Sequence, residues 1–366
     1  MESMVGNHYI LAPAYKGKKV FLTGHTGFKG AWMMAWLHKL GATVKGFSLP
    51  AEDEHGIYNN LDKEITAQSV IGDIRNKKQL ADEIASFQPD FIFHLAAQAL
   101  VRYSYRHPAE TFEVNVTGTA NLLEAAAAFT GKCTIVVITT DKVYHNNEWH
   151  YPYRENDRLG GYDPYSASKA CAELVVDSFR NSFFHPNKYA THQKALASAR
   201  AGNVIGGGDW SKDRIVPDII RALAADEKIP LRNPNAVRPW QHVLEPIEGY
   251  LLLGAKLAQE PLTYAKAYNF GPLPHQELTV SALVEQGIHY WGKGSWEDVS
   301  SPNQPHEAGL LTLDINLANK ELGWQPKLSN QEAIQWTLEW FKTYLTDKSN
   351  ILFEQITAYE SKCNNQ

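Results

Sequence analysis

A strand, a glycine-rich turn and a helix near the N-terminus constrain the fold more than any other part of the sequence. Residues 18–30 are KKVFLTGHTGFKG, and the apolar residues 20–22 within them predict a short buried strand. Gly24, Gly27 and Gly30 follow at every third position, and an apolar, helix-like segment comes next. Such glycines let a pyrophosphate approach the backbone at a helix N-terminus, where free N–H groups and the helix dipole attract anions. The stretch therefore predicts a nucleotide site, with an ordinary glycine-rich turn as the alternative.

Charge, cysteine content and hydropathy argue against several classes of protein. The chain has 366 residues and a formal net charge of -5, and its basic residues are scattered, so we expect no nucleic-acid partner. The three cysteines (Cys133, Cys171 and Cys363) lack metal-ligand spacing and are odd in number, which indicates a reduced, cytoplasmic protein without a metal site. We also expect no signal peptide and no membrane association, because no apolar run reaches membrane-spanning length.

The apolar segments after the glycine turn alternate between strand-like and helix-like patterns. Strands are predicted at residues 43–47, 70–74, 90–98, 135–138 and 199–206, and helices at residues 110–129, 166–183 and 215–223. This alternation predicts an α/β fold built on a doubly wound parallel sheet. His94 lies inside an apolar run, so we interpret it as a core histidine rather than a catalytic base.

Two polar stretches carry the predicted chemistry. The strand at residues 135–138 is followed by Thr140, Asp141 and Lys142, and ligands of open α/β sheets bind beyond the carboxyl ends of strands. Tyr165 and Lys169 are four residues apart, so on a helix both side chains leave the same face. There the ammonium is expected to lower the pKa of the phenol, which could then take a proton from an alcohol as hydride leaves. A local ion pair that ends the strand is the alternative for Asp141 and Lys142.

Residues at the ends of the strands predicted at 43–47 and 70–74 indicate which nucleotide the chain binds. Ser48 and two apolar residues stand where an acidic residue would hold the ribose 2′-hydroxyl, and no arginine follows for a 2′-phosphate, so NAD is favoured over NADP. Asp73 is predicted to meet the adenine, with a surface turn as the alternative. Asn115 is predicted either to organise a polar link to the active site or to bond to its own helix backbone.

Together these motifs occur in the order found in the extended short-chain dehydrogenases/reductases, which the chain resembles over roughly residues 17–340. Within that superfamily, nucleotide-sugar 4,6-dehydratases carry a Thr-Asp-(Glu/Lys) signature, here Thr140, Asp141 and Lys142. Lysine at the third position is similar to the CDP-glucose 4,6-dehydratases. Residues 24–32, 202–210 and 238–246 also resemble that subfamily.

The resemblance implies a Rossmann-like NAD-binding domain over residues 17–202, with returning segments near 239–271. A smaller α/β lobe that binds the nucleotide sugar is implied over residues 203–238 and 272–345, followed by a C-terminal tail at 346–366. Within residues 306–314 it implies a loop that closes over the nucleotide. The implied cofactor contacts are Gly24, Gly27, Phe28, Lys29, Gly30, Asp73, Ile74, Leu95, Ala96, Ala97, Tyr165 and Lys169.

The implied substrate contacts are Gln98, Asn203, Arg214 and Arg238. Arginine suits bidentate binding of a diphosphate better than lysine, and solvated surface arginines are the alternative for Arg214 and Arg238. The catalytic set implied for dehydration of CDP-glucose is Thr140, Asp141, Lys142, Tyr165 and Lys169.

The family further implies a homodimer and a role in making deoxy sugars for cell-surface polysaccharide such as O-antigen. A different nucleotide-sugar 4,6-dehydratase, a 4-epimerase and a non-catalytic dinucleotide-binding protein are the alternatives.

Overall fold

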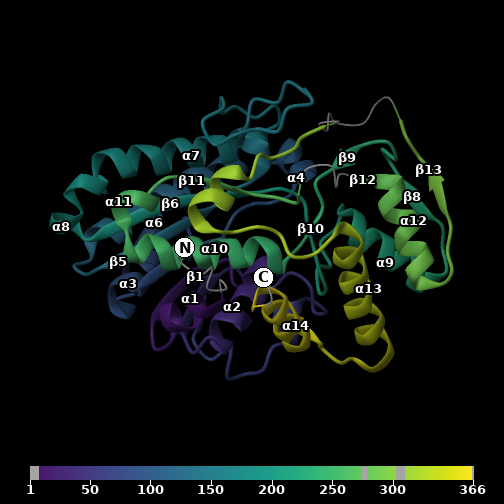
Figure 1. The fold of residues 1–366 in the computed structure, drawn as a ribbon, viewed down its shortest axis with the longest axis horizontal. Coiled ribbons are helices and arrows are strands. Elements are labelled where there is room, and N and C mark those ends of the chain that lie inside the picture. The colour runs from purple at the N-terminus through teal and green to yellow at the C-terminus, as the bar shows by residue number, and fades with distance from the viewer. Residues whose placement is uncertain (1–7, 274–277, 302–309, 365–366) are drawn as a thin grey trace, which may run out of the picture.

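A seven-stranded parallel sheet forms the centre of the larger part of the molecule (Figure 1). The computed structural model describes residues 8–273, 278–301 and 310–364. The strand order is β11-β6-β5-β4-β1-β2-β3, and every neighbouring pair is parallel. The strands are β1 (Lys19–Thr23), β2 (Thr43–Ser48), β3 (Ser69–Ile71), β4 (Phe91–His94), β5 (Cys133–Ile138), β6 (Lys194–Ala201) and β11 (Ala267–Phe270). The predicted fold class is confirmed.

Helices cover both faces of this sheet. On one face lie α2 (Phe28–Lys39) and α10 (Leu244–Gln259), and on the other lie α3 (Lys77–Phe87), α6 (Gly118–Ala128) and α7 (Pro164–Ser182). Successive strand residues point to opposite faces, so Phe91 and Phe93 join one apolar core and Ile92 joins the other. Because both faces are buried, β4 and β5 are almost entirely apolar rather than alternating, whereas β6 and β11 also bury the polar residues Ser198, Arg200 and Asn269.

The strand order reverses between β1 and β4, which creates a crevice beyond the carboxyl ends of these two strands. The glycine turn follows β1, and residues 95–98 follow β4 at the same edge. The predicted nucleotide site therefore lies at the topological switch point.

Several sequence-based boundaries differ from the structure, since the strands predicted at 70–74 and 90–98 already end at Ile71 and His94. The strand predicted at 199–206 begins at Lys194 and ends at Ala201, and a separate strand β7 (Val204–Ile205) pairs with β10 (Gln241–His242). The start of this strand was not predicted because Lys194 is buried there, and a lysine is rarely found inside a central strand. The helix predicted at 110–129 is three consecutive segments: α5 (Pro108–Phe112), the π-helical turn η2 (Glu113–Thr117) and α6.

A smaller lobe, at the right in Figure 1, is built from three helices and short strand pairs. Its helices are α9 (Ile215–Ala225), α12 (Val280–Trp291) and α13 (Asn330–Asp347), and its strands are β8 (Ile229–Leu231), β9 (Val237–Arg238), β12 (Leu278–Thr279) and β13 (Trp296–Asp298). Residues 306–309 of the predicted closing loop lie outside the described residues. The predicted domain boundaries stay a prediction.

The segment predicted as a C-terminal tail contains the helix α14 (Leu352–Asn364), which packs against α2. Leu352, Ile356 and Tyr359 are fully buried, and they recur at the spacing of one helix face. Trp36 Nε1 on α2 donates a hydrogen bond to Glu360 Oε1 at 2.9 Å. The apolar stripe of this helix therefore has its partner surface on α2, and the boundary at residue 346 stays a prediction.

Short elements complete the described chain. They are α1 (His8–Tyr15), α4 (Val101–Arg106), α8 (Tyr189–His192), α11 (Pro261–Tyr264), η1 (Ile57–Asn60), η3 (Asp141–Val143), η4 (Pro186–Lys188) and η5 (Ala318–Leu322). Within residues 8–273, 278–301 and 310–364, no helix is both long and apolar enough to cross a bilayer.

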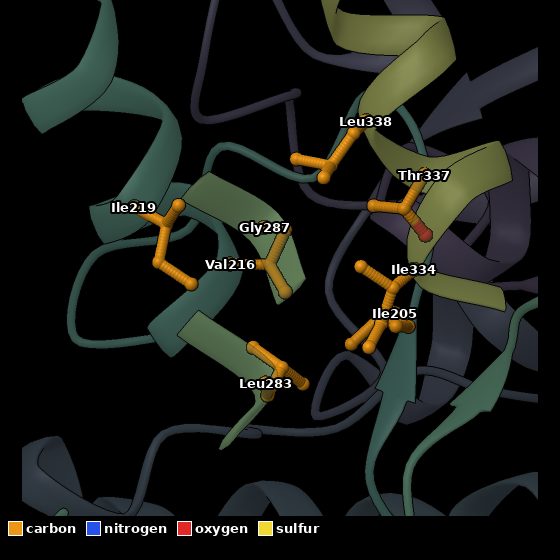
Figure 2. A pocket seen from close by; sticks show the side chains of 8 residues that line it. All are labelled: Ile205, Val216, Ile219, Leu283, Gly287, Ile334, Thr337 and Leu338. Carbon is orange, nitrogen blue, oxygen red and sulfur yellow. The ribbon is translucent and has the colours of Figure 1, made fainter. Parts of the chain in front are cut away.

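An apolar cavity lies in the smaller lobe, between α9, α12 and α13 (Figure 2). Its lining is entirely hydrophobic apart from Thr337 and includes Gly287 in the middle of α12. A Cβ atom on Gly287 would have its nearest neighbours, methyl groups of Ile219 and Leu338, at 3.9 Å. The site thus has room for one methyl group.

We predict that Gly287→Ala raises the free energy of unfolding by about 1 kcal/mol, because alanine favours a helix interior over glycine. The methyl group also fills part of the cavity. Urea unfolding followed by circular dichroism measures this change. The matched control is Gly249→Ala in α10, where a Cβ would lie 2.3 Å from the Phe270 ring. That variant should be destabilised, and a loss of stability in both variants would contradict the prediction.

Candidate active site

The glycine turn after β1 is shaped by close backbone contacts. Gly24 has a φ of +76°, and a Cβ on it would lie 2.6 Å from the Ala96 amide nitrogen of the loop after β4. A Cβ on Gly30 would lie 2.0 Å from the Gly24 carbonyl oxygen. Gly27, the N-cap of α2, is exposed and makes no side-chain capping bond. The turn therefore offers a bare helix N-terminus, which suits an anionic group.

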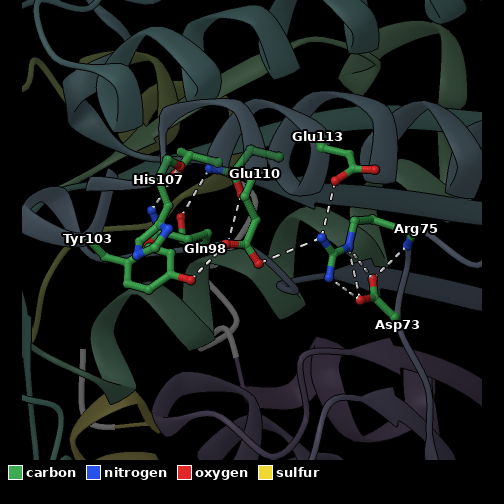
Figure 3. Close-up of polar contacts among 9 residues, drawn as sticks. Asp73, Arg75, Gln98, Tyr103, His107, Glu110 and Glu113 are labelled. Carbon is green, nitrogen blue, oxygen red and sulfur yellow. Dashed lines mark hydrogen bonds and ion pairs between the residues drawn. The ribbon is translucent and has the colours of Figure 1, made fainter. Parts of the chain in front are cut away.

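An ionic cluster holds the loop after β3 (Figure 3). Arg75 grips Asp73 through Nε and Nη2, with Nη2 2.7 Å from Asp73 Oδ2, and its Nη1 donates to Glu113 Oε2 at 3.2 Å. The hydrogen bonds from Arg75 hold the pKa of Asp73 below its usual range. Asp73 is thus an ionised and oriented carboxylate that is partly exposed. Its predicted contact with adenine, and that of neighbouring Ile74, stay predictions.

The end of β2 carries hydroxyl groups in place of a carboxylate. Thr26 Oγ1 of the glycine turn lies 2.9 Å from Ser48 Oγ and donates to the Leu49 carbonyl oxygen. The chain therefore places neutral donors and acceptors, and neither an acid nor an arginine, at the position expected for the ribose.

His94 is bonded on both ring nitrogens. Nδ1 lies 2.7 Å from Thr23 Oγ1, and Nε2 lies 3.2 Å from Thr119 Oγ1. Burial lowers the pKa of His94 to about 3, and the positive charge of Lys169 adds to this effect. The prediction of a core histidine is confirmed.

Thr140 and Asp141 form a buried turn directly after β5. Thr140 Oγ1 donates to Asp141 Oδ1 at 2.9 Å and accepts from the Lys142 amide, which begins the short helix η3. Asp141 is only 3% exposed, and the charge of Lys142 acts on it, so a local ion pair at the strand end stays the alternative. Burial raises the pKa of Asp141, although the positive charge of Lys142 opposes the shift. A carboxyl that keeps its proton to higher pH can serve as a general acid.

Tyr165 and Lys169 share the face of α7 that points to this turn, since the Tyr165 hydroxyl interacts with Thr140. Burial raises the pKa of Tyr165 to about 12, so the expected lowering by Lys169 is not what the structure shows. Lys169 Nζ instead donates to the Ile138 carbonyl oxygen at 3.0 Å, at the end of β5. Burial also lowers the pKa of Lys169 to about 8. Desolvation is the largest cause of both shifts.

Two further cations face the same cleft. Burial lowers the pKa of Lys29 to about 7, and the charges of Arg214 and Lys169 lower it further. Arg214, the N-cap of α9, donates to Asp209 Oδ2 at 3.1 Å and keeps about a third of its side chain exposed. Lys29, Lys169 and Arg214 therefore converge from three elements, and their charges favour an anionic ligand.

The loop after β6 and the end of β9 lie close to Asp141. A Cβ on Gly202 would lie 3.2 Å from Asp141 Oδ2 and 3.0 Å from the Pro239 ring. The neighbouring residues Asn203 and Arg238 consequently flank the cleft, and the charge of Arg238 acts to lower the pKa of Asp141. Their contacts with substrate stay predictions.

Gln98 and Asn115 tie the loop after β4 to helices. Gln98 Nε2 donates to Thr111 Oγ1, and Gln98 Oε1 accepts from the Leu100 amide, so its side chain is held within the protein. Asn115 bonds to both backbone groups of Gln98 and donates to Ser168 Oγ on α7 at 2.8 Å. This bears out the polar link that was one of the two predictions for Asn115. The substrate contact of Gln98 stays untested.

Tyr250 on α10 was missed by sequence reasoning. It is fully buried, its ring lies 6.0 Å from Lys29 Nζ, and among the described residues its hydroxyl has no hydrogen-bond partner. Its charge interactions with Tyr165 and Asp141 place it beside the cleft. No local pattern marks it, because α10 is apolar along most of its length.

Comparison with known proteins decides the family. Residues 21–337 match the model described as GDP-mannose 4,6 dehydratase. The chain belongs to the GDP-mannose 4,6-dehydratase family. A CDP-glucose 4,6-dehydratase from Salmonella typhimurium is 45% identical over 92% of this chain and 94% of that protein. The predicted membership of a nucleotide-sugar 4,6-dehydratase family of enzymes is thus confirmed.

Solved structures share the fold. The UDP-glucose 4-epimerase of Thermotoga maritima superposes with a TM-score of 0.76 at 22% identity, over 89% of this chain and 99% of that one. A dTDP-glucose 4,6-dehydratase from Streptomyces venezuelae, solved with NAD bound, gives a TM-score of 0.73 at 23% identity over 89% and 97% of the two chains. Both confirm the doubly wound sheet with its second lobe.

We predict that Asp141→Asn stabilises the protein near neutral pH. A raised pKa means that wild-type stability falls as pH rises from about 4, the pKa of an unfolded aspartate, through the folded value. Asparagine keeps the acceptor for Thr140 and has no proton to lose. The variant should therefore gain about 1 kcal/mol or more over the wild type at about pH 8 and little at about pH 4.

Urea unfolding at the two pH values measures the difference. Asp177→Asn is the control, because Asp177 lies on the exposed side of α7 with 58% of its side chain exposed. Equal stability of Asp141→Asn and wild type at the higher pH would contradict the raised pKa.

Proposed function

We propose that the protein is a CDP-glucose 4,6-dehydratase that converts CDP-glucose into CDP-4-keto-6-deoxyglucose and water. One observation carries the proposal: Thr140 of a buried Thr140–Asp141 pair interacts directly with the Tyr165 hydroxyl. The 45% identity with the enzyme from Salmonella typhimurium supports the choice of substrate, as does the lysine at position 142.

NAD is the proposed cofactor, and the crevice fits it. Gly24 and Gly30 occupy positions that a Cβ would block, and the N-terminus of α2 lies bare beside them for a pyrophosphate. Hydroxyl groups at the end of β2 and the oriented carboxylate of Asp73 suit the adenosine. When bound, NAD supplies the oxidant for C4 and later the reductant for C6, so that it is regenerated.

Oxidation at C4 needs a base for the 4-hydroxyl. Tyr165 takes this proton, and Thr140 holds the same oxygen in line through a hydrogen bond. Because burial raises the pKa of Tyr165 to about 12, the free site keeps the phenol protonated at neutral pH. The phenol has to release this proton to solvent before it can accept the one from the 4-hydroxyl, and the positive charges of Lys169 and Arg214 favour the phenolate in the loaded site.

Elimination needs an acid and a base at once. The 4-ketone acidifies the C5 proton, Lys142 removes it, and Asp141 protonates the departing 6-hydroxyl. The raised pKa of the buried Asp141 carboxyl suits the acid. The net change is loss of one water, with no net oxidation of the sugar.

The direct test is to incubate the purified chain separately with CDP-, dTDP-, GDP- and UDP-hexoses. CDP-glucose should give a product with the alkaline absorbance of a 4-keto-6-deoxy sugar. Recovery of only the C4 epimer would refute dehydration, and preference for another nucleotide would refute the assignment of the base.

We predict that Tyr165→Phe lowers kcat by at least about 100-fold, because no other group takes the 4-hydroxyl proton. NAD affinity should stay within about twofold of wild type, since the glycine turn is untouched. Coupled turnover and a fluorescence titration with NAD measure the two quantities. Tyr162→Phe is the control on the same segment, since Tyr162 is 79% exposed. Full activity of Tyr165→Phe would refute the role.

We also propose a cytoplasmic homodimer formed through α6 and α7. Leu174 and Phe183, at α7 and its C-terminal end, are 58% and 57% exposed, which is costly for large apolar side chains unless a partner covers them. Three unpaired cysteines, Cys133, Cys171 and Cys363, fit a reducing compartment. A monomeric mass in light scattering would refute the dimer.

A further inference from the structure

A buried ion pair lies next to the turn that carries Thr140, Asp141 and Lys142. Arg200 Nη2 on β6 donates to Glu173 Oε2 on α7 at 2.8 Å, and the two side chains are 5% and 4% exposed. Although burial opposes it, the charge of Arg200 and three hydrogen bonds bring the pKa of Glu173 below its usual value. Both groups are therefore charged inside the protein.

The carboxylate holds the residue that precedes the turn. Thr139 Oγ1 donates to Glu173 Oε1 at 2.5 Å, while the Thr139 amide donates to the Ala199 carbonyl oxygen. Ser198 Oγ, inside β6, donates to Glu173 Oε2 at 2.8 Å. Glu173 thus joins β5 and β6 where the two strands end.

The guanidinium holds the residue that follows the turn. Arg200 Nη1 donates to the Tyr144 hydroxyl at 2.8 Å, and the guanidinium lies 5.1 Å from the centroid of the Tyr144 ring. The Tyr144 hydroxyl in turn donates to Asn269 Oδ1 on β11 at 2.7 Å. The ion pair therefore forms hydrogen bonds at both ends of the segment 140–143, with Thr139 on one side and Tyr144 on the other.

The same pair is also built into the helix that carries the other catalytic groups. Tyr165, Lys169 and Glu173 follow one another at four-residue steps on α7, so they share one face. The negative charge of Glu173 raises the pKa of Lys169 against the effect of burial. Glu173 thus contacts one catalytic segment directly and lies on the same helix as the other.

Stability alone does not explain a buried ion pair, because apolar side chains of similar volume are often as stable or more so. The cost of burying two charges is offset here by directional bonds that reach Thr139 and Tyr144, although Arg200 Nε has no partner among the described residues. Such bonds fix a geometry that apolar packing would leave looser.

We propose that Glu173 and Arg200 are positioning residues that fix the position of the Asp141 carboxyl relative to the Tyr165 hydroxyl. This placement couples oxidation at C4 to loss of the 6-hydroxyl. The inference deepens the proposed dehydratase function and rests on it. Neither residue touches the substrate; both act through Thr139 and Tyr144. Loosening the turn should leave oxidation possible while elimination slows, since Tyr165 stays on its helix and Asp141 moves.

The test removes the bond at one end of the turn. Thr139→Val keeps the side-chain shape and loses the hydroxyl that donates to Glu173. We expect kcat to fall by about 10- to 100-fold, because a small misplacement of a catalytic group has effects of this size, with KM within about twofold. Reduced nicotinamide should accumulate during turnover and be visible in its near-ultraviolet absorbance. Tyr144→Phe should do the same from the other end.

Two matched variants separate positioning from stability. Ser198→Ala removes a hydrogen bond to the same carboxylate but leaves both ends of the turn attached, so its kcat should stay near wild type. Thr139→Ser restores the donor and should restore kcat. Thermal melting of all four variants measures the loss of stability. The proposal is overturned if Ser198→Ala lowers kcat as much as Thr139→Val, or if Thr139→Val leaves kcat unchanged.

A second readout does not depend on the substrate. Amide hydrogen exchange in residues 140–143 should be faster in Thr139→Val than in Ser198→Ala, and equal rates would overturn the proposal. Failure of wild type to act on CDP-glucose would refute the proposed function alone. The kinetic comparison then uses whichever nucleotide hexose the wild type dehydrates.

Discussion

The close approach of the loops after β1 and β4 is the constraint on which the rest of the site depends. Gly24 lies so near the Ala96 backbone that even a methyl group would overlap with it. This contact closes the floor of the crevice at the point where the strand order reverses, and it turns the N-terminus of α2 toward the same space. The end of β5, which is followed by Thr140 and Asp141, lies beside the end of β4 at the same edge of the sheet.

Desolvation is the main cause of the pKa shifts of the ionisable groups beyond these strand ends. The cleft draws Lys29, Lys169 and Arg214 together, and burial moves the pKa values of both lysines toward neutrality. The same burial keeps protons on Asp141 and Tyr165 to higher pH. The carboxyl and the phenol therefore hold their protons to higher pH, and the two lysines lose their charge more readily than in water. The buried pair of Glu173 and Arg200, by contrast, stays ionised and provides geometry.

The second lobe and the C-terminal helix complete the arrangement from outside the sheet. α9 brings Arg214 to the cleft, and the segment after β8 brings Arg238. α14 covers α2 through Tyr359 and Glu360, and the helix that begins at the glycine turn is buried from Gly30 to Leu37. Residues far apart in the sequence thus hold the nucleotide end and the sugar end of one crevice in register.

The sequence by itself determined the local units: the strand, glycine turn and helix at residues 18–37, the Thr140–Lys142 segment and the Tyr165/Lys169 spacing. Each is a contiguous pattern whose geometry follows from helix and strand periodicity, and family resemblance added the reaction. Glu173 was within reach of the same reasoning, because it continues the four-residue spacing of Tyr165 and Lys169.

Only the tertiary structure decided how these units act on one another. The pKa of Tyr165 rises instead of falling, because burial is the largest cause of the shift and is a property of the assembled cleft. Arg200 pairs with Glu173 across 27 positions, and α14 finds its partner more than 300 residues earlier, as the 324-residue separation of Trp36 and Glu360 shows. Long-range burial and pairing of this kind leave no periodic signal in the chain, so they become visible only once the strands and helices are packed.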